Sequence, residues 1–172
     1  LTADHQLVVN HDETFKGVTM QNATEKVCTA VQLDNGEQLP TLRQYLDEAR
    51  KLKTRLILEL KGHKTPEQET RAVEGIVSMI KEMGLEERTE YITFSRHATQ
   101  EFIRLAPKGT PVYYLTGDVA PKELKEWGCA GPDYHFSVFK KNPGWIKECH
   151  DLGMKVNAWT VNETPDMEWL IS

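Results

Sequence analysis

The sequence lacks the features that mark several specialised classes of protein. Nowhere do about eighteen apolar residues follow one another, so a transmembrane helix is excluded. No block of Lys and Arg is present of the kind that follows a phosphate backbone, and nucleic acid is therefore not an expected partner. No signal peptide is visible, although the chain opens at Leu1 rather than at Met, so that its beginning is expected to lie elsewhere.

Cysteine is also scarce. The three cysteines, Cys28, Cys129 and Cys149, are an odd number, without a C-x-x-C spacing or a neighbouring histidine pair. A disulfide scaffold and a zinc site are both poorly supported by this pattern. We expect all three to be buried as small apolar residues.

What is present is the composition of an ordinary globular protein. Of 172 residues, 39% are hydrophobic and 27% are charged, and 21 Lys and Arg against 26 Asp and Glu give a net charge of -5. No composition break or linker divides the chain. We therefore expect one domain over residues 1–172.

Short apolar runs alternate with amphipathic stretches from Arg55 onward, as in βα units that build a parallel sheet. The expected strands are 55–61, 91–94, 112–115, 134–138 and 155–161. This series predicts an α/β fold, a TIM (β/α)8 barrel that is incomplete as given. An open doubly wound sheet is the alternative, but the G-x-G-x-x-G turn typical of its nucleotide-binding members is missing.

The beginning of the chain follows another pattern. Leu7–Val9 reads as a strand, and residues 13–39 form a polar, weakly patterned excursion with an Asn-Gly turn at Asn35 and Gly36. We expect this excursion to be a small insertion on the barrel rim. A helix with one apolar face should follow over residues 41–53, opened by a capping box of Thr41 and Gln44.

The segment LILELKG, residues 56–62, is the most informative for chemistry. Side chains alternate along a strand, so Ile57, Glu59 and Lys61 share one face and three leucines share the other. In a barrel the carboxyl end of a strand is where active sites are built. The alternative is that Glu59 and Lys61 pair with each other or with neighbouring residues, or that the strand lies at a rim and is solvated.

Two further segments carry candidate residues. His11, in VVNHD, could act as a general acid or base, or could lie exposed in a turn that Asp12 caps. Trp159, in VNAWTVN, could stack on a substrate or could fill the barrel interior.

The segments VVNHD, LPTL, LELKG, ITFS and WTVN follow one another at suitable spacing. In this order they resemble the motifs of the glycerophosphodiester phosphodiesterase family. The resemblance implies a TIM barrel that hydrolyses glycerophosphodiesters to sn-glycerol 3-phosphate and an alcohol, with a divalent ion, Ca²⁺ or Mg²⁺, as cofactor. It also implies roles for four residues: His11 as a catalytic histidine, Glu59 as a metal ligand, Lys61 at the phosphate and Trp159 at the glycerol end of the pocket.

Three motifs of the family are missing, namely H-R-G with its first catalytic histidine, P-E-N-T, and the E-x-D pair of metal ligands. The final G-V-D-G-I-x-T-D strand is missing as well. We therefore expect the chain to be part of a longer barrel and to be inactive alone. Intact mass spectrometry is the check, because a mass near 19.7 kDa would contradict a longer chain.

Two alternative functions stay open at this point. One is a non-catalytic binding barrel of the same fold, and the other is a related phosphodiesterase acting on phosphoinositides or lysophospholipids. The resemblance is closest to bacterial members, which predicts a soluble bacterial protein of the periplasm or cytoplasm with a small-molecule substrate. The compartment, the preferred ion, the alcohol and the oligomeric state are not predicted.

Overall fold

The protein folds around one sheet of parallel strands. The computed structural model describes residues 1–171. Five strands pair in parallel, in the order β3-β4-β5-β6-β7. They are β3 (Leu56–Leu60), β4 (Thr89–Thr93), β5 (Val112–Tyr114), β6 (Gly131–His135) and β7 (Asn157–Trp159). Each strand thus lies beside its neighbour in the chain, as in a (β/α) barrel.

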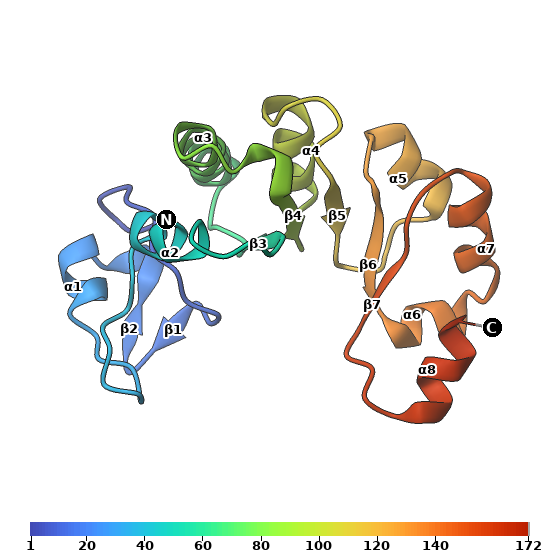
Figure 1. Ribbon diagram of the computed structural model, residues 1–172, viewed down its shortest axis with the longest axis horizontal. Helices are drawn as coiled ribbons and strands as arrows, with labels where there is room; N and C mark the ends of the chain where they lie inside the picture. The colour runs from blue at the N-terminus through green and yellow to red at the C-terminus, as the bar shows by residue number, and fades with distance from the viewer. Residues whose placement is uncertain (172) are drawn as a thin grey trace.

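Helices connect the strands and cover one side of the sheet. They are α3 (Pro66–Glu82), α4 (Arg96–Leu105), α5 (Pro121–Trp127), α6 (Phe136–Lys141) and α7 (Gly144–Asp151), with η2 (Glu86–Arg88) before β4 and α8 (Thr164–Ile171) after β7. Figure 1 shows the strands following an arch, with α3, α4, α5 and α7 on its outer side. The sheet does not close on itself, and β3 and β7 are its edges. This is an incomplete TIM barrel, as the sequence predicted.

The two faces of β3 differ as the alternation predicted. Leu56, Leu58 and Leu60 join the hydrophobic core beneath the outer helices. Ile57 points to the other face and remains 63% exposed. The same alternation continues in β4, where Tyr91 stacks on Phe102 of α4 at 4.3 Å between ring centroids. The outer face of the sheet is therefore the core, and the concave face is open to ligands.

One glycine fixes the approach of the last two strands. At Gly131, the first residue of β6, an added Cβ would lie 1.7 Å from the backbone oxygen of Lys155. Only a residue without a side chain fits there. The close contact lets β6 pair with β7 and continue the arch.

The segment before the sheet differs from the prediction. Residues 7–9 do not form a strand, and Val8 makes only an isolated bridge with Thr41. Val9 N–H donates to the carbonyl of Pro40, and Leu42 N–H donates to the carbonyl of Leu7. Because Pro40 has no N–H of its own, the ladder cannot extend further.

The excursion predicted at residues 13–39 contains short elements. These are β1 (Thr14–Phe15), β2 (Val18–Thr19), η1 (Met20–Asn22) and α1 (Glu25–Thr29), and α2 (Leu42–Ala49) follows them. β1 and β2 form a small antiparallel sheet of their own. Met20, Cys28, Val31 and Leu39 form a core separate from those under the parallel sheet.

Several local signals are confirmed and one strand was misplaced. The capping box of Thr41 and Gln44 is present, and Cys28, Cys129 and Cys149 are all buried free thiols. The strand expected at 134–138 was wrong: β6 ends at His135 and α6 begins at Phe136. Glycine and proline at the start of β6 hide the strand, because both are rare in strands. The aromatic and β-branched residues after it belong to the helix instead.

No helix within residues 1–171 combines the length and the apolar character that crossing a membrane requires.

Candidate active site

Glu59 and Lys61 lie at the carboxyl end of β3, on the concave face. Lys61 Nζ donates to Glu59 Oε1 at 2.8 Å, and the side chains are 34% and 22% exposed for lysine and glutamate. The sequence left open whether these two residues would pair with each other, and they do. Within residues 1–171 the second oxygen of Glu59 has no hydrogen-bond partner. One carboxylate oxygen and two ammonium protons thus remain available to a ligand.

His11 lies in an exposed turn and is oriented by its neighbour. Its Nδ1 lies 3.0 Å from Asp12 Oδ1, and its side chain is 86% exposed. An ionised carboxylate can only accept a hydrogen bond, so Nδ1 carries the proton of the neutral ring. Nε2 is then left with a free lone pair, which is the state of a general base.

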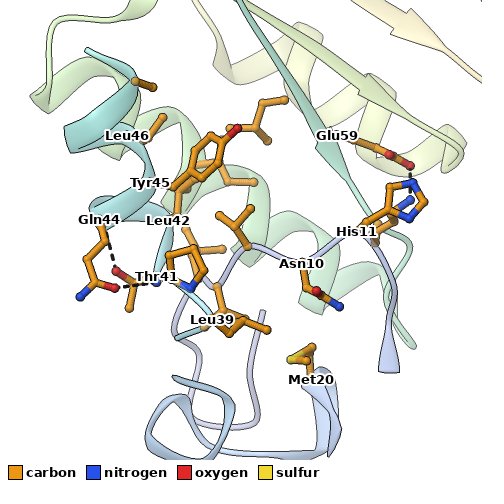
Figure 2. A pocket seen from close by; sticks show the side chains of 18 of the residues that line it. Asn10, His11, Met20, Leu39, Thr41, Leu42, Gln44, Tyr45, Leu46 and Glu59 are labelled. Atoms are coloured by element: carbon orange, nitrogen blue, oxygen red, sulfur yellow. Dashed lines mark hydrogen bonds and ion pairs between the residues drawn. The ribbon is translucent and has the colours of Figure 1, made fainter. Parts of the chain in front are cut away.

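One large cavity brings these residues together. It measures about 1410 Å³ and lies between the N-terminal segment, α2 and β3. His11, Glu59 and Lys61 all line it. Figure 2 shows His11 and Glu59 on one side of this cavity, with Leu42, Tyr45 and Leu46 of α2 on another. The three polar residues thus line one cavity, which also includes residues from both faces of the edge strand β3.

Trp159 is not among the residues that line this cavity. It ends β7, where its ring meets Phe94 edge-on at 5.9 Å between centroids. Its Nε1–H donates to the carbonyl of Asp133 at 2.9 Å. Phe94 follows Thr93, the last residue of β4, and Thr93 pairs with Leu60, the residue before Lys61. The contact between Phe94 and Trp159 therefore links the lysine end of the site to the tryptophan across the concave face.

Asp133 is a concave-face carboxylate that the sequence reasoning missed. It stands in β6 opposite Asn157 of β7. Burial, with a further contribution from the charge of Glu59, raises the pKa of Asp133 to about 6. The misplaced strand hid this residue, although alternation with Tyr134, which is buried in the core, would have placed it on the concave face.

Glu69 was missed as well, because it stands in the first turn of α3 and looks like an ordinary surface residue. It is only 6% exposed. Its Oε1 accepts the backbone N–H of His63 at 3.2 Å, and its Oε2 accepts the hydroxyl of Ser95 at 2.6 Å. Ser95 caps α4, and His63 belongs to the loop that follows β3. This carboxylate therefore joins the loops after two neighbouring strands at the rim of the site.

The described residues do not make a complete metal site. Within residues 1–171 no three His, Cys, Asp or Glu side chains converge in a group that could hold an ion. Glu59 offers a hard oxygen ligand of the kind that Mg²⁺ and Ca²⁺ prefer, but these ions take about six or more oxygen ligands. Glu59 would therefore be one ligand of such an ion, with water or substrate oxygens among the others.

The family model described as "Glycerophosphoryl diester phosphodiesterase family" matches residues 1–172, the whole chain. The chain belongs to this family. A glycerophosphodiester phosphodiesterase of Caldanaerobacter subterraneus subsp. tengcongensis is 26% identical, over 99% of this chain and 74% of the relative. The glycerophosphoryl diester phosphodiesterase family is a family of hydrolases, and the resemblance first seen in the motifs is confirmed.

Solved structures agree with the family and the fold. The crystal structure of a glycerophosphodiester phosphodiesterase from Parabacteroides distasonis is 50% identical, with a TM-score of 0.96, over 99% of this chain and 72% of that one. A phosphodiesterase from Oleispira antarctica, solved in complex with the product sn-glycerol-3-phosphate, has a TM-score of 0.84 at 19% identity, over 99% of this chain and 74% of that one. The second likeness shows the fold alone.

Proposed function

We propose that the protein hydrolyses glycerophosphodiesters to sn-glycerol 3-phosphate and an alcohol, by general acid–base catalysis and with a divalent ion. The observation that carries the proposal is the shared cavity of His11, Glu59 and Lys61, in a chain that the family model matches throughout. The Oleispira phosphodiesterase, named for a complex with sn-glycerol-3-phosphate, supports the substrate class.

The reaction adds water to phosphorus and breaks the bond between phosphorus and the alcohol oxygen. His11 Nε2 takes a proton from the attacking water, because Asp12 keeps the ring proton on Nδ1. The ring passes this proton to solvent, and the departing alkoxide takes a proton from water or from a second acid, so that the products are the alcohol and sn-glycerol 3-phosphate. The attacking and leaving oxygens lie on opposite sides of phosphorus, so His11 alone does not reach both of them at once.

Lys61 stabilises the phosphate. Its ammonium lies two residues beyond the carboxylate of Glu59 on the same face of the strand, and it has two protons free for the non-bridging oxygens. Trp159 offers an apolar ring edge and face for the carbon atoms of glycerol. The proposal thus assigns phosphate to β3 and glycerol to β7.

The dependence of activity on a divalent ion is tested separately. Glu59 would be one of its ligands, and the ion would supply positive charge to the phosphate oxygens when bound. Release of sn-glycerol 3-phosphate should stop in EDTA and return on addition of Mg²⁺ or Ca²⁺. Activity that is insensitive to EDTA would remove the ion and leave the acid–base chemistry standing.

The test of the function is the release of sn-glycerol 3-phosphate from glycerophosphoethanolamine by the full-length protein, followed with a coupled dehydrogenase. His11→Asn should lower kcat by about a hundredfold or more, since a positioned proton-transfer group contributes about that much. The matched control is His150→Asn, a substitution of an exposed histidine at the end of α7, and it should leave the rate unchanged. A His11→Asn enzyme with the wild-type rate would contradict the role of His11.

If the protein turns over no glycerophosphodiester with either Mg²⁺ or Ca²⁺ present, it is a non-catalytic binding barrel of the same fold. If the protein hydrolyses phosphoinositides or lysophospholipids and leaves glycerophosphodiesters intact, it is a related phosphodiesterase with a different substrate.

A further inference from the structure

His135 is a residue of the concave rim to which no role has been assigned. It ends β6, stands in register with Trp159 of β7, and is partly exposed. The two rings meet edge-on, with 5.1 Å between centroids and an interplanar angle of 83°. His135 therefore lies beside the residue that the proposed function places at the glycerol.

The hydrogen bonds of His135 determine which nitrogen carries its proton. The backbone N–H of Ser137 lies 3.3 Å from Nδ1 and can only donate. The hydroxyl of Ser137 lies 2.8 Å from the same nitrogen. Nδ1 must therefore be an acceptor, which places the proton of the neutral ring on Nε2. His135 has the opposite tautomer to His11 and is a hydrogen-bond donor rather than a base.

The donating nitrogen is available to a ligand. Within residues 1–171 Nε2 of His135 makes no hydrogen bond, and it is not among the fully buried side-chain atoms without a partner. Its ring is held on one side by Trp159 and on another by Phe136, whose centroid lies 4.8 Å away. A fixed ring with one free N–H, next to an indole, is a site for a hydroxyl group on a short carbon chain.

The order of side chains around the rim supports this assignment. Lys61 and Phe94 each directly follow the last residue pair of β3 and β4, Phe94 contacts Trp159, and Trp159 contacts His135. A cation for phosphate thus stands at one end of an aromatic row and a neutral donor at the other. The groups of glycerol 3-phosphate follow the same order, with a phosphate at one end and hydroxyl groups at the other.

We propose that His135 is a specificity-determining residue whose Nε2–H donates a hydrogen bond to a glycerol hydroxyl group of the substrate. The inference rests on the proposed function and deepens it, because it says how the site distinguishes a glycerol diester from a diester without hydroxyl groups. A glycerol diester pairs with this donor and gains affinity over a diester without hydroxyl groups.

The experiment compares two substrates in two variants. His135→Phe keeps a ring against Trp159 and removes the donor, and His135→Asn keeps an oxygen that can cap α6 but is too short to reach the position of Nε2. For both variants we expect KM for glycerophosphoethanolamine to rise about tenfold with kcat nearly unchanged. Kinetics with bis(4-nitrophenyl) phosphate, which has no glycerol, should stay at wild-type values.

The control is His97→Phe, the same substitution in α4, where the histidine bonds to Thr70 and not to the rim. His97→Phe should leave the ratio of kcat/KM for glycerophosphoethanolamine to kcat/KM for bis(4-nitrophenyl) phosphate unchanged. An equal loss on both substrates in the His135 variants, or an unchanged KM for glycerophosphoethanolamine, would overturn the inference.

A binding measurement separates this inference from the proposed function. By calorimetry, both variants should bind sn-glycerol 3-phosphate about tenfold more weakly than wild type and inorganic phosphate equally well. If wild type turns over neither diester but this binding difference is found, the proposed function fails and the role of His135 stands. If wild type and variants bind sn-glycerol 3-phosphate alike, the role of His135 fails whatever the activity.

Discussion

Lys61 Nζ lies 2.8 Å from Glu59 Oε1, so that the two charged residues of the concave face of β3 hold each other in place. Both side chains keep part of their contact with water, and the pair offsets the remaining desolvation while leaving part of each group open. The ion pair is therefore compatible with a binding role. A ligand anion would approach Lys61 from the side that Glu59 does not occupy.

Replacing Lys61 should separate binding from stability. Lys61→Met should raise KM for a glycerophosphodiester and lower kcat, together by about a hundredfold in kcat/KM, because the phosphate loses its ammonium. The free energy of unfolding should change by less than about 1 kcal/mol, since the pair is partly exposed to solvent. Urea denaturation checks the stability, and Lys122→Met on the exposed side of α5 is the control. A full rate in Lys61→Met would remove the residue from the site.

Asp133 should make stability depend on pH. Its pKa is raised to about 6, so between the unfolded value and about 6 the folded protein binds a proton that the unfolded chain does not. The contribution of Asp133 therefore opposes folding above pH 6 and fades as the pH falls toward 4. Asp133→Asn should stabilise the protein at pH 7 by on the order of 1 kcal/mol after allowance for solvent screening, and should give no gain at pH 4.

The pKa of Asp133 also measures its electrostatic interaction with Glu59. Because the charge of Glu59 raises the pKa of Asp133, Glu59→Gln should lower that pKa, as followed by carboxyl ¹³C shifts in a titration. Asp34→Asn, at an exposed carboxylate in the N-terminal region, should have no effect. An unchanged pKa of Asp133 in Glu59→Gln would mean that the two groups do not face the same space.

Gly131 should tolerate no side chain. Its Cβ would lie 1.7 Å from the oxygen of Lys155, so Gly131→Ala must push β6 away from β7. We expect a loss of several kcal/mol in the free energy of unfolding, or no folded protein at all. Gly144→Ala is the matched control, because an added Cβ there meets nothing within 4 Å, and its thermal midpoint should stay the same or rise slightly. Similar midpoints for the two variants would contradict the close approach.

Glu69 should matter through the loops that it joins. Glu69→Ala leaves the Ser95 hydroxyl and the His63 N–H without their acceptor, and should cost about 2 kcal/mol or more by urea denaturation. Glu74→Ala, on the exposed side of the same helix, should cost little. If both substitutions cost the same, the buried carboxylate is not the link between the loops.

Much of the fold could be predicted from local pattern, and the failures have local causes. The alternation in LILELKG places Glu59 and Lys61 on the concave face because side chains in a strand must alternate. The expected strand at residues 7–9 was wrong because Pro40, its neighbour, cannot donate a ladder hydrogen bond. The strand around Asp133 was misplaced because glycine is rare in strands. Gly131 is required there by its close contact with the backbone of Lys155, which is seen only in the folded chain.

The candidate site was predicted only as far as motif chemistry reaches. His11, Glu59 and Lys61 could be named because the ordered motifs that contain them resemble those of the family. Asp133 and Glu69 could not, because burial and a bridge between loops depend on residues distant in the sequence. His135 could not, because its contact with Trp159 depends on the pairing of β6 with β7.

The most direct test of the central claim is the rate of sn-glycerol 3-phosphate release from glycerophosphoethanolamine by the full-length wild-type protein and by Glu59→Gln, with Glu126→Gln on α5 as control. We predict a wild-type and control activity that EDTA abolishes, and a loss of about a hundredfold or more in Glu59→Gln with an unchanged thermal midpoint. Equal release by wild type and Glu59→Gln would contradict the site proposed at the end of β3.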